Sequence, residues 1–166
     1  MPVQPRIVCG GGIQVGVKYN ALSVDHLEYT GDEEIAALLG SETMPTVLPG
    51  AAFFLGMVYA PVRKMIDAGL PIAMASDYNP GSCPSGNMQL VLSMACINYK
   101  MLPEEAFNAV TLNSAYAMGV SDTHGTIAKG KVANFYITKP ITTLEFMPYA
   151  FGINKIERAF LNGTER

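Results

Sequence analysis

Asp77 stands where a carboxylate could bind a metal ion or move a proton. It follows a short apolar run, residues 71–75, whose composition predicts a buried strand. The sequence Asn-Pro-Gly-Ser at positions 79–82 is typical of a tight polar turn. In α/β barrels, side chains at the C-terminal ends of the strands carry the chemistry. Asn79 and the amides of Gly81 and Ser82 could hold a polar substrate. Alternatively, the segment forms an Asx-type turn that caps the next helix.

His26 is the second candidate, near the end of a predicted strand over residues 21–27. Taken alone, it fits a structural histidine at a strand end as well as an active-site group. Asp25 could orient it, but successive strand residues point to opposite faces, so we expect no direct contact. Glu28 shares the face of His26, and no other feature of the sequence singles it out.

The metal-ligand count of the chain is low. A hydrolytic metal site needs three or more protein ligands and an open position for water. The sequence has two histidines, and His124 lies in a polar Ser-Asp-Thr-His-Gly turn. Cys9 could ligate zinc, but no other donor stands beside it. We expect Cys83 to be a small buried residue.

Alternating strands and helices must position these side chains. Strands are predicted over residues 21–27, 46–48 and 71–75, with helices over 30–39 and 58–68 between them. Strands separated by helices imply parallel pairing and right-handed crossovers. Further helices are predicted over residues 13–19, 88–99 and 111–118 and from 103 onward, and further strands over 132–137 and 157–162.

Composition favours one α/β domain with a buried core. The chain has 166 residues, of which 49% are hydrophobic and 15% charged. A closed eight-stranded barrel takes about 250 residues, so three parallel strands with their helices cannot close one by themselves. The net charge of −3 gives no electrostatic argument for nucleic acid or for an anionic membrane as a partner.

Cysteine usage and the N-terminal sequence indicate the cytoplasm. The three cysteines are odd in number and show no CxxC spacing, which is typical of free thiols in a reducing compartment. The first five residues lack the charged and apolar regions of a signal peptide. No apolar run reaches the roughly 18 residues of a membrane helix. We therefore expect a soluble cytoplasmic protein.

Three segments, in this order and spacing, resemble the imidazolonepropionases, metal-dependent amidohydrolases of histidine degradation. They are Ala-Leu-Ser-Val-Asp-His-Leu-Glu at 21–28, Val-Leu-Pro-Gly at 47–50 and Ser-Asp-Tyr-Asn-Pro-Gly-Ser at 76–82. The turn after the aspartate is the most specific of them. Residues 125–135 resemble the C-terminal β-segment of amidohydrolases, with Asn134 where that family usually has aspartate.

The resemblance implies the last strands and helices of a (β/α)8, TIM-type amidohydrolase barrel over residues 1–120. Residues 121–166 would form the C-terminal β segment of a composite small domain. The implied reaction opens the ring C–N bond of 4-imidazolone-5-propanoate, a small-molecule substrate, to give N-formimino-glutamate.

The resemblance also implies a role for each site residue. Asp77 would ligate zinc or iron. His26 would act as an acid–base group on the nucleophilic water or the substrate. Asn79 and Gly81 would hold the product, and Ser82 would touch the substrate.

Several family features are missing from this sequence. It lacks the paired histidines of the first strand, and Ile-Val-Cys-Gly at 7–10 stands where the histidine of the fifth strand is expected. The arginine and tyrosine residues that grip the propionate are also absent.

We therefore expect the C-terminal portion of such an enzyme, inactive alone and binding no metal tightly by itself. We also expect a homo-oligomer, because a partial sheet leaves unpaired edges. Two alternatives stay open: another amidohydrolase of cyclic amides or deamination substrates, and a non-catalytic assembly module.

Overall fold

Three parallel strands form the sheet that carries both candidate residues. The computed structural model describes residues 11–166, and in it β1 (Ser23–Asp25), β2 (Met44–Val47) and β3 (Ala73–Met74) lie in the order β1-β2-β3. Both neighbouring pairs are parallel. The three predicted strands are therefore present, although each is shorter or slightly shifted. Spatial order follows chain order, as in a singly wound α/β barrel.

The connections between these strands are helical. α2 (Asp32–Leu39) joins β1 to β2, with three acidic residues in its first turn that suit the positive end of the helix dipole. Two helices, α3 (Pro49–Phe54) and α4 (Val62–Asp67), lie between β2 and β3. The prediction of one helix over 58–68 was wrong in its first part. Pro61 is the N-cap of α4 and disfavours helical geometry in the residue before it.

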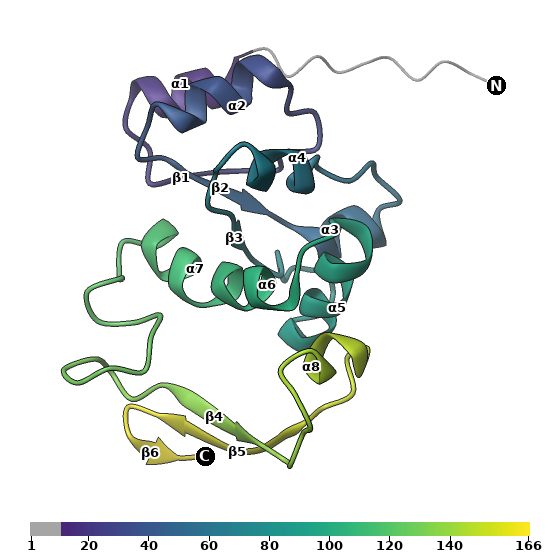
Figure 1. Cartoon of the computed structure of the whole chain (residues 1–166), viewed down its shortest axis with the longest axis vertical. Coiled ribbons are helices and arrows are strands. Elements are labelled where there is room, and N and C mark those ends of the chain that lie inside the picture. Colours follow the sequence, from purple (N-terminus) through teal and green to yellow (C-terminus); the bar gives the residue numbers. More distant parts are fainter. Residues whose placement is uncertain (1–10) are drawn as a thin grey trace.

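The remaining helices pack at the two sides of the sheet. Figure 1 shows α1 (Gly12–Lys18) and α2 next to β1, and α6 (Pro103–Val110) and α7 (Leu112–Ala117) next to β3. α5 (Met88–Asn98) packs against α3 and α6. The core between these elements is apolar, and its most buried large side chains include Leu27, Val47, Met65, Met74 and Leu92.

A second, antiparallel sheet follows α7. It contains β4 (Phe135–Thr138), β5 (Ile156–Leu161) and β6 (Thr164–Glu165), and α8 (Phe146–Tyr149) in the β4–β5 connection packs on α5. In Figure 1 this sheet lies at the end of the molecule opposite α1 and α2. Phe135 and Phe160 stack across the β4–β5 pair with ring centroids 4.7 Å apart. The predicted strand over 132–137 is present as β4, but it begins later, at Phe135.

The outer edges of the first sheet have no strand neighbour within residues 11–166, because β1 and β3 each pair only with β2 there. None of the helices in this part of the chain has the length and apolar character needed to cross a bilayer. Cys9, considered above as a zinc ligand, lies outside the described residues.

Candidate functional site

His26 and Asp77 lie at the same edge of the first sheet. His26 directly follows β1, and Asp77 comes three residues after β3. Because the strands are parallel, their carboxyl ends meet at one edge, where open and closed α/β sheets bind ligands. β2 lies between them, so their strands are two spacings, or about 10 Å, apart.

Both residues adopt left-handed backbone geometry. φ is 58° at His26 and 54° at Asp77. Such angles are uncommon outside glycine, and aspartate and histidine are among the residues that tolerate them best. The chain therefore turns sharply directly after β1 and shortly after β3. Backbone strain of this kind clusters at functional sites, where the surrounding fold maintains it.

The turn after Asp77 holds its carboxylate at both oxygens. The Ser82 hydroxyl donates to Oδ2 at 2.6 Å, and Asn79 Nδ2 donates to Oδ1 at 3.1 Å. Asn79 Nδ2 also donates to the backbone oxygen of Asp77 at 2.9 Å. Hydrogen bonds to an ionised acceptor are stronger than neutral ones. The carboxylate is thus fixed in one orientation.

Asn79 organises this turn through its own oxygen. Oδ1 accepts from the amides of Gly81 at 2.8 Å and Ser82 at 2.9 Å, which is the geometry of an Asx turn. The two amides considered as substrate donors are therefore bonded to Asn79 here. The Asx turn is confirmed, but its capping role is not. α5 is capped by Asn87, whose side chain accepts from the amides at the start of that helix.

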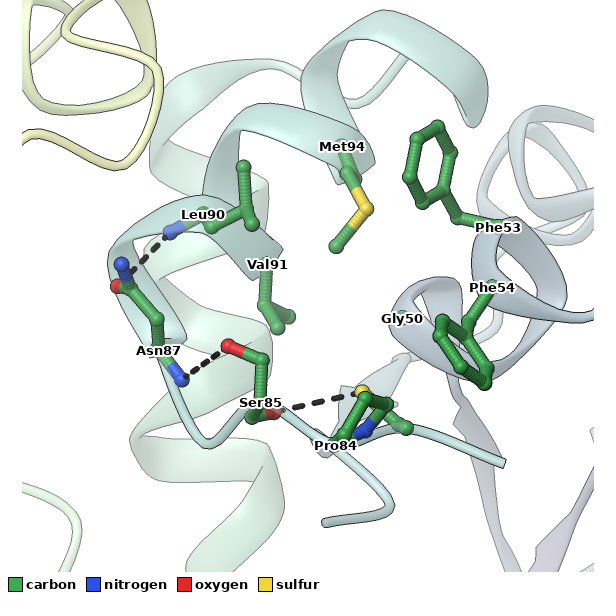
Figure 2. A pocket seen from close by; sticks show the side chains of 10 residues that line it. Gly50, Phe53, Phe54, Pro84, Ser85, Asn87, Leu90, Val91 and Met94 are labelled. Carbon is green, nitrogen blue, oxygen red and sulfur yellow. Dashed lines mark hydrogen bonds between the residues drawn. The ribbon is translucent and has the colours of Figure 1, made fainter. Parts of the chain in front are cut away.

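An apolar pocket of about 140 Å³ lies beside this turn, between α3 and α5. Figure 2 shows Phe53 and Phe54 of α3 on one side and Val91 and Met94 of α5 on the other. Cys83 also lines the pocket and is buried, as predicted, with Sγ donating to the backbone oxygen of Ser85 at 3.3 Å.

Gly50 allows α3 to approach the turn closely. A Cβ atom at this position would lie 2.7 Å from Cys83 Sγ and 3.3 Å from the backbone oxygen of Ser76. Any other residue would force either α3 or the Cys83 side chain to move. In the sequence, the signal for this close approach is the Pro-Gly pair that follows a buried strand.

His26 borders a second pocket, of about 250 Å³. α1, β1 and the turn after β1 line it, through Gly12, Ile13, Val24, Asp25, His26, Leu27 and Thr30. The His26 side chain is 50% exposed, and its Nδ1 lies 3.7 Å from Oε1 of Glu28. Asp25 instead accepts a hydrogen bond from the Ser23 hydroxyl at 3.2 Å. Glu28 is thus the carboxylate that faces the histidine.

The donors for a metal ion are incomplete in this part of the chain. No cluster of three or more His, Cys, Asp or Glu side chains within residues 11–166 is placed to hold one. A carboxylate such as Asp77 suits a hard or borderline cation. Asp77 could supply one ligand, whereas a hydrolytic site needs three or more from the protein.

Comparison with known proteins decides the family. Residues 26–164, which include His26, Asp77 and the whole turn after it, match the amidohydrolase family. The chain belongs to the amidohydrolase family.

Among solved amidohydrolase-type folds, it is similar to a zinc-bound adenosine deaminase from Xanthomonas campestris, with a TM-score of 0.78, 20% identity, and coverage of 86% of this chain and 36% of that one. Escherichia coli guanine deaminase gives a TM-score of 0.72 at 19% identity, with coverage of 86% and 38%. These likenesses show the fold: the parallel sheet and its helices are part of an amidohydrolase-type barrel.

Imidazolonepropionases are more similar to this chain in sequence than these solved structures are. The chain is 59% identical to imidazolonepropionase from Christiangramia forsetii and 61% identical to that from Flavobacterium johnsoniae, each over 153 residues and 92% of this chain. Identity to the Bacillus velezensis imidazolonepropionase is 41% over 154 residues, again 92% of this chain. The chain spans about 37% of the length of the first two relatives and 36% of the third.

Proposed function

We propose that this chain supplies the acid–base and turn components of an imidazolonepropionase active site. The observation that carries the proposal is the placement of His26 and the Asp77 turn at one sheet edge, within a span 59–61% identical to imidazolonepropionases. The reaction would open the ring C–N bond of 4-imidazolone-5-propanoate and give N-formimino-glutamate.

In this reaction His26 moves protons. Its half-exposed imidazole takes a proton from the attacking water and delivers it to the ring nitrogen as the C–N bond breaks. Asp77 would be one ligand of a zinc or iron ion, and the other ligands would come from outside residues 11–166. The ion would supply Lewis acidity, which activates water and polarises a carbonyl group.

The turn residues position the other groups. Asn79 acts by keeping the turn in shape, since its amide nitrogen and oxygen are both bonded within it. Ser82 orients Asp77 and lies next to the substrate. Gly81 is exposed, so its surface is open to the substrate or product. Holding the substrate in one orientation lowers the entropic barrier of the reaction.

Features beyond the site are part of the same proposal. The change from a parallel to an antiparallel sheet supports the division into a barrel portion, residues 1–120, and a small-domain portion, 121–166. The sheet edges would be covered by the rest of the enzyme and by a second copy in a homo-oligomer. Within residues 11–166, Cys83 and Cys96 form no disulfide, which is compatible with a reducing compartment such as the cytoplasm.

A deaminase is the second candidate, because the similar folds include adenosine and guanine deaminases. The Asn-Pro-Gly-Ser turn after Asp77 favours imidazolonepropionase, since that turn carries the more specific resemblance.

A chimera tests the proposal. This chain replaces the matching segment of the Flavobacterium johnsoniae enzyme, and loss of the absorbance of 4-imidazolone-5-propanoate is followed. We expect turnover close to that of the unmodified relative. A folded chimera that leaves this substrate intact would overturn the proposal, and deamination of adenosine or guanine would favour the second candidate.

A further inference from the structure

Glu28 is a buried carboxylate at the same sheet edge as His26. Its side chain is 4% exposed, against 50% for His26. Burying a carboxylate is costly unless a hydrogen-bond donor or a cationic partner compensates. Among the ion pairs formed by the described residues, the one that includes Glu28 joins it to Nδ1 of His26, at 3.7 Å.

The backbone brings these two side chains together. β1 ends at Asp25, and the left-handed φ of His26 takes the chain off the path of the strand. A turn then follows, closed by a hydrogen bond from Thr30 N to Leu27 O at 3.2 Å. Leu27 is 2% exposed and anchors the turn in the core. The pairing of His26 with Glu28 is therefore built into the fold.

A buried phenol, that of Tyr99, lies close enough to Glu28 to feel its charge. Burial, and after it the charge of Glu28, raises the pKa of Tyr99 well above its ordinary value, so this hydroxyl stays protonated. Tyr59 packs edge-on against Tyr99 with ring centroids 5.6 Å apart. The protonated hydroxyl of Tyr99 therefore brings no charge to Glu28. The imidazole of His26 faces the carboxylate and also lines the pocket.

We propose that Glu28 is a positioning residue that holds the His26 ring through Nδ1. The other nitrogen, Nε2, then faces the pocket and exchanges protons with water and substrate. A distance of 3.7 Å exceeds that of a normal hydrogen bond. Contacts of this kind are often long in unliganded sites and shorten when substrate binds. A carboxylate that accepts from Nδ1–H fixes both tautomer and ring orientation. This inference rests on the proposed function, in which His26 is the acid–base group.

The tautomer of His26 can be measured on the 166-residue chain without substrate or metal. The chain has two histidines, so a ¹⁵N-labelled sample gives two imidazole patterns in a long-range ¹H–¹⁵N spectrum, and His124→Gln identifies the one from His26. In its neutral form, we expect the His26 ring to carry its proton mainly on Nδ1. In Glu28→Leu the proton should move mainly to Nε2. Asp25→Asn is the matched control and should leave the wild-type pattern unchanged.

Two results would overturn the proposal. One is an Nε2–H tautomer of His26 in the wild-type chain, which decides the matter even if Glu28→Leu fails to fold. The other is an unchanged tautomer in a Glu28→Leu chain whose backbone amide spectrum is intact. Both are independent of turnover, so an inactive chimera would count against the proposed function alone. In an active chimera, Glu28→Leu should lower kcat about 10–100-fold with little change in KM.

Discussion

The Ser82 hydroxyl lies 2.6 Å from Oδ2 of Asp77 and donates a hydrogen bond to it. With the amide of Asn79 on Oδ1, it fixes the carboxylate before any ion or substrate arrives. A site assembled in advance in this way does not spend binding energy on ordering its own side chains.

Ser82→Ala should therefore destabilise the chain. We expect the free energy of unfolding at pH 7 to fall by about 1–2 kcal/mol, since the lost bond is made to a charged group. Urea denaturation measures this change. Ser85→Ala is the control, because the Ser85 hydroxyl accepts only a 3.3 Å bond from the Asn87 amide. Equal losses in the two variants would contradict a special role for the Ser82–Asp77 bond.

The three parallel strands could be predicted from the sequence, because apolar residues mark each of them and predicted helices separate them. The helix α3 is not among the predicted helices for a local reason. A Pro-Gly pair after a strand is typical of a turn, but proline is also well suited to the first position of a helix. Gly50 then serves the approach to Cys83, a tertiary contact that local sequence does not reveal.

The site shows a similar limit. The polar turn after Asp77 was predictable from residue types alone. The sequence left two arrangements open: an Asx turn in which Asn79 accepts from the amides of Gly81 and Ser82, and a turn whose amides are free for a substrate. The structure has the first. From the alternation of side chains along a strand, Glu28 was expected to share a face with His26. The fold pairs the two residues through a left-handed turn instead.

Glu105 should give the stability a pH dependence. Hydrogen bonds from Arg63, at 2.8 and 3.0 Å, outweigh burial and, with the Leu102 amide, lower the pKa of Glu105 below its ordinary value of 4.5. The stabilisation is thus complete above pH 4.5 and is lost as the pH falls through the lowered folded-state pKa.

Glu105→Gln tests this dependence by urea denaturation at several pH values. It should lower the free energy of unfolding by about 1 kcal/mol at pH 7, and the difference should shrink below about pH 4.5. Glu165→Gln, which breaks the more exposed pair with Arg158, should have a smaller effect. A Glu105→Gln deficit that persists unchanged at low pH would count against the assignment.

We expect the 166-residue chain alone to bind zinc or iron only weakly. Asp77 and His26 lie two strands apart, and no third donor joins them within residues 11–166. Metal analysis after dialysis against metal-free buffer checks this expectation. One equivalent of tightly held metal that disappears in Asp77→Ala would show that the chain completes the site by itself.

The chain alone should also self-associate. β1 and β3 have no outer neighbour in the part of the sheet described, and Leu22, Phe53 and Phe54 are each more than half exposed. Unpaired edges and apolar patches favour association. Sedimentation velocity at low micromolar concentration should show a dimer or larger species, and a stable monomer would refute this.

The central claim is that His26 moves protons while Asp77 binds the metal ion. It is tested most directly by measuring turnover and metal content together in the chimera. His26→Ala should keep the metal and lower turnover about 10²–10⁴-fold, the usual effect of losing a positioned acid–base group. Asp77→Asn should lose both metal and turnover, because a neutral amide is a weaker ligand than a carboxylate.

His124→Ala is the control for this measurement. Its ring contacts the Thr123 hydroxyl in an exposed turn, so both metal content and turnover should stay at the level of the unmodified chimera. The account predicts that metal content and turnover separate in His26→Ala and fall together in Asp77→Asn. Full turnover in His26→Ala would contradict it.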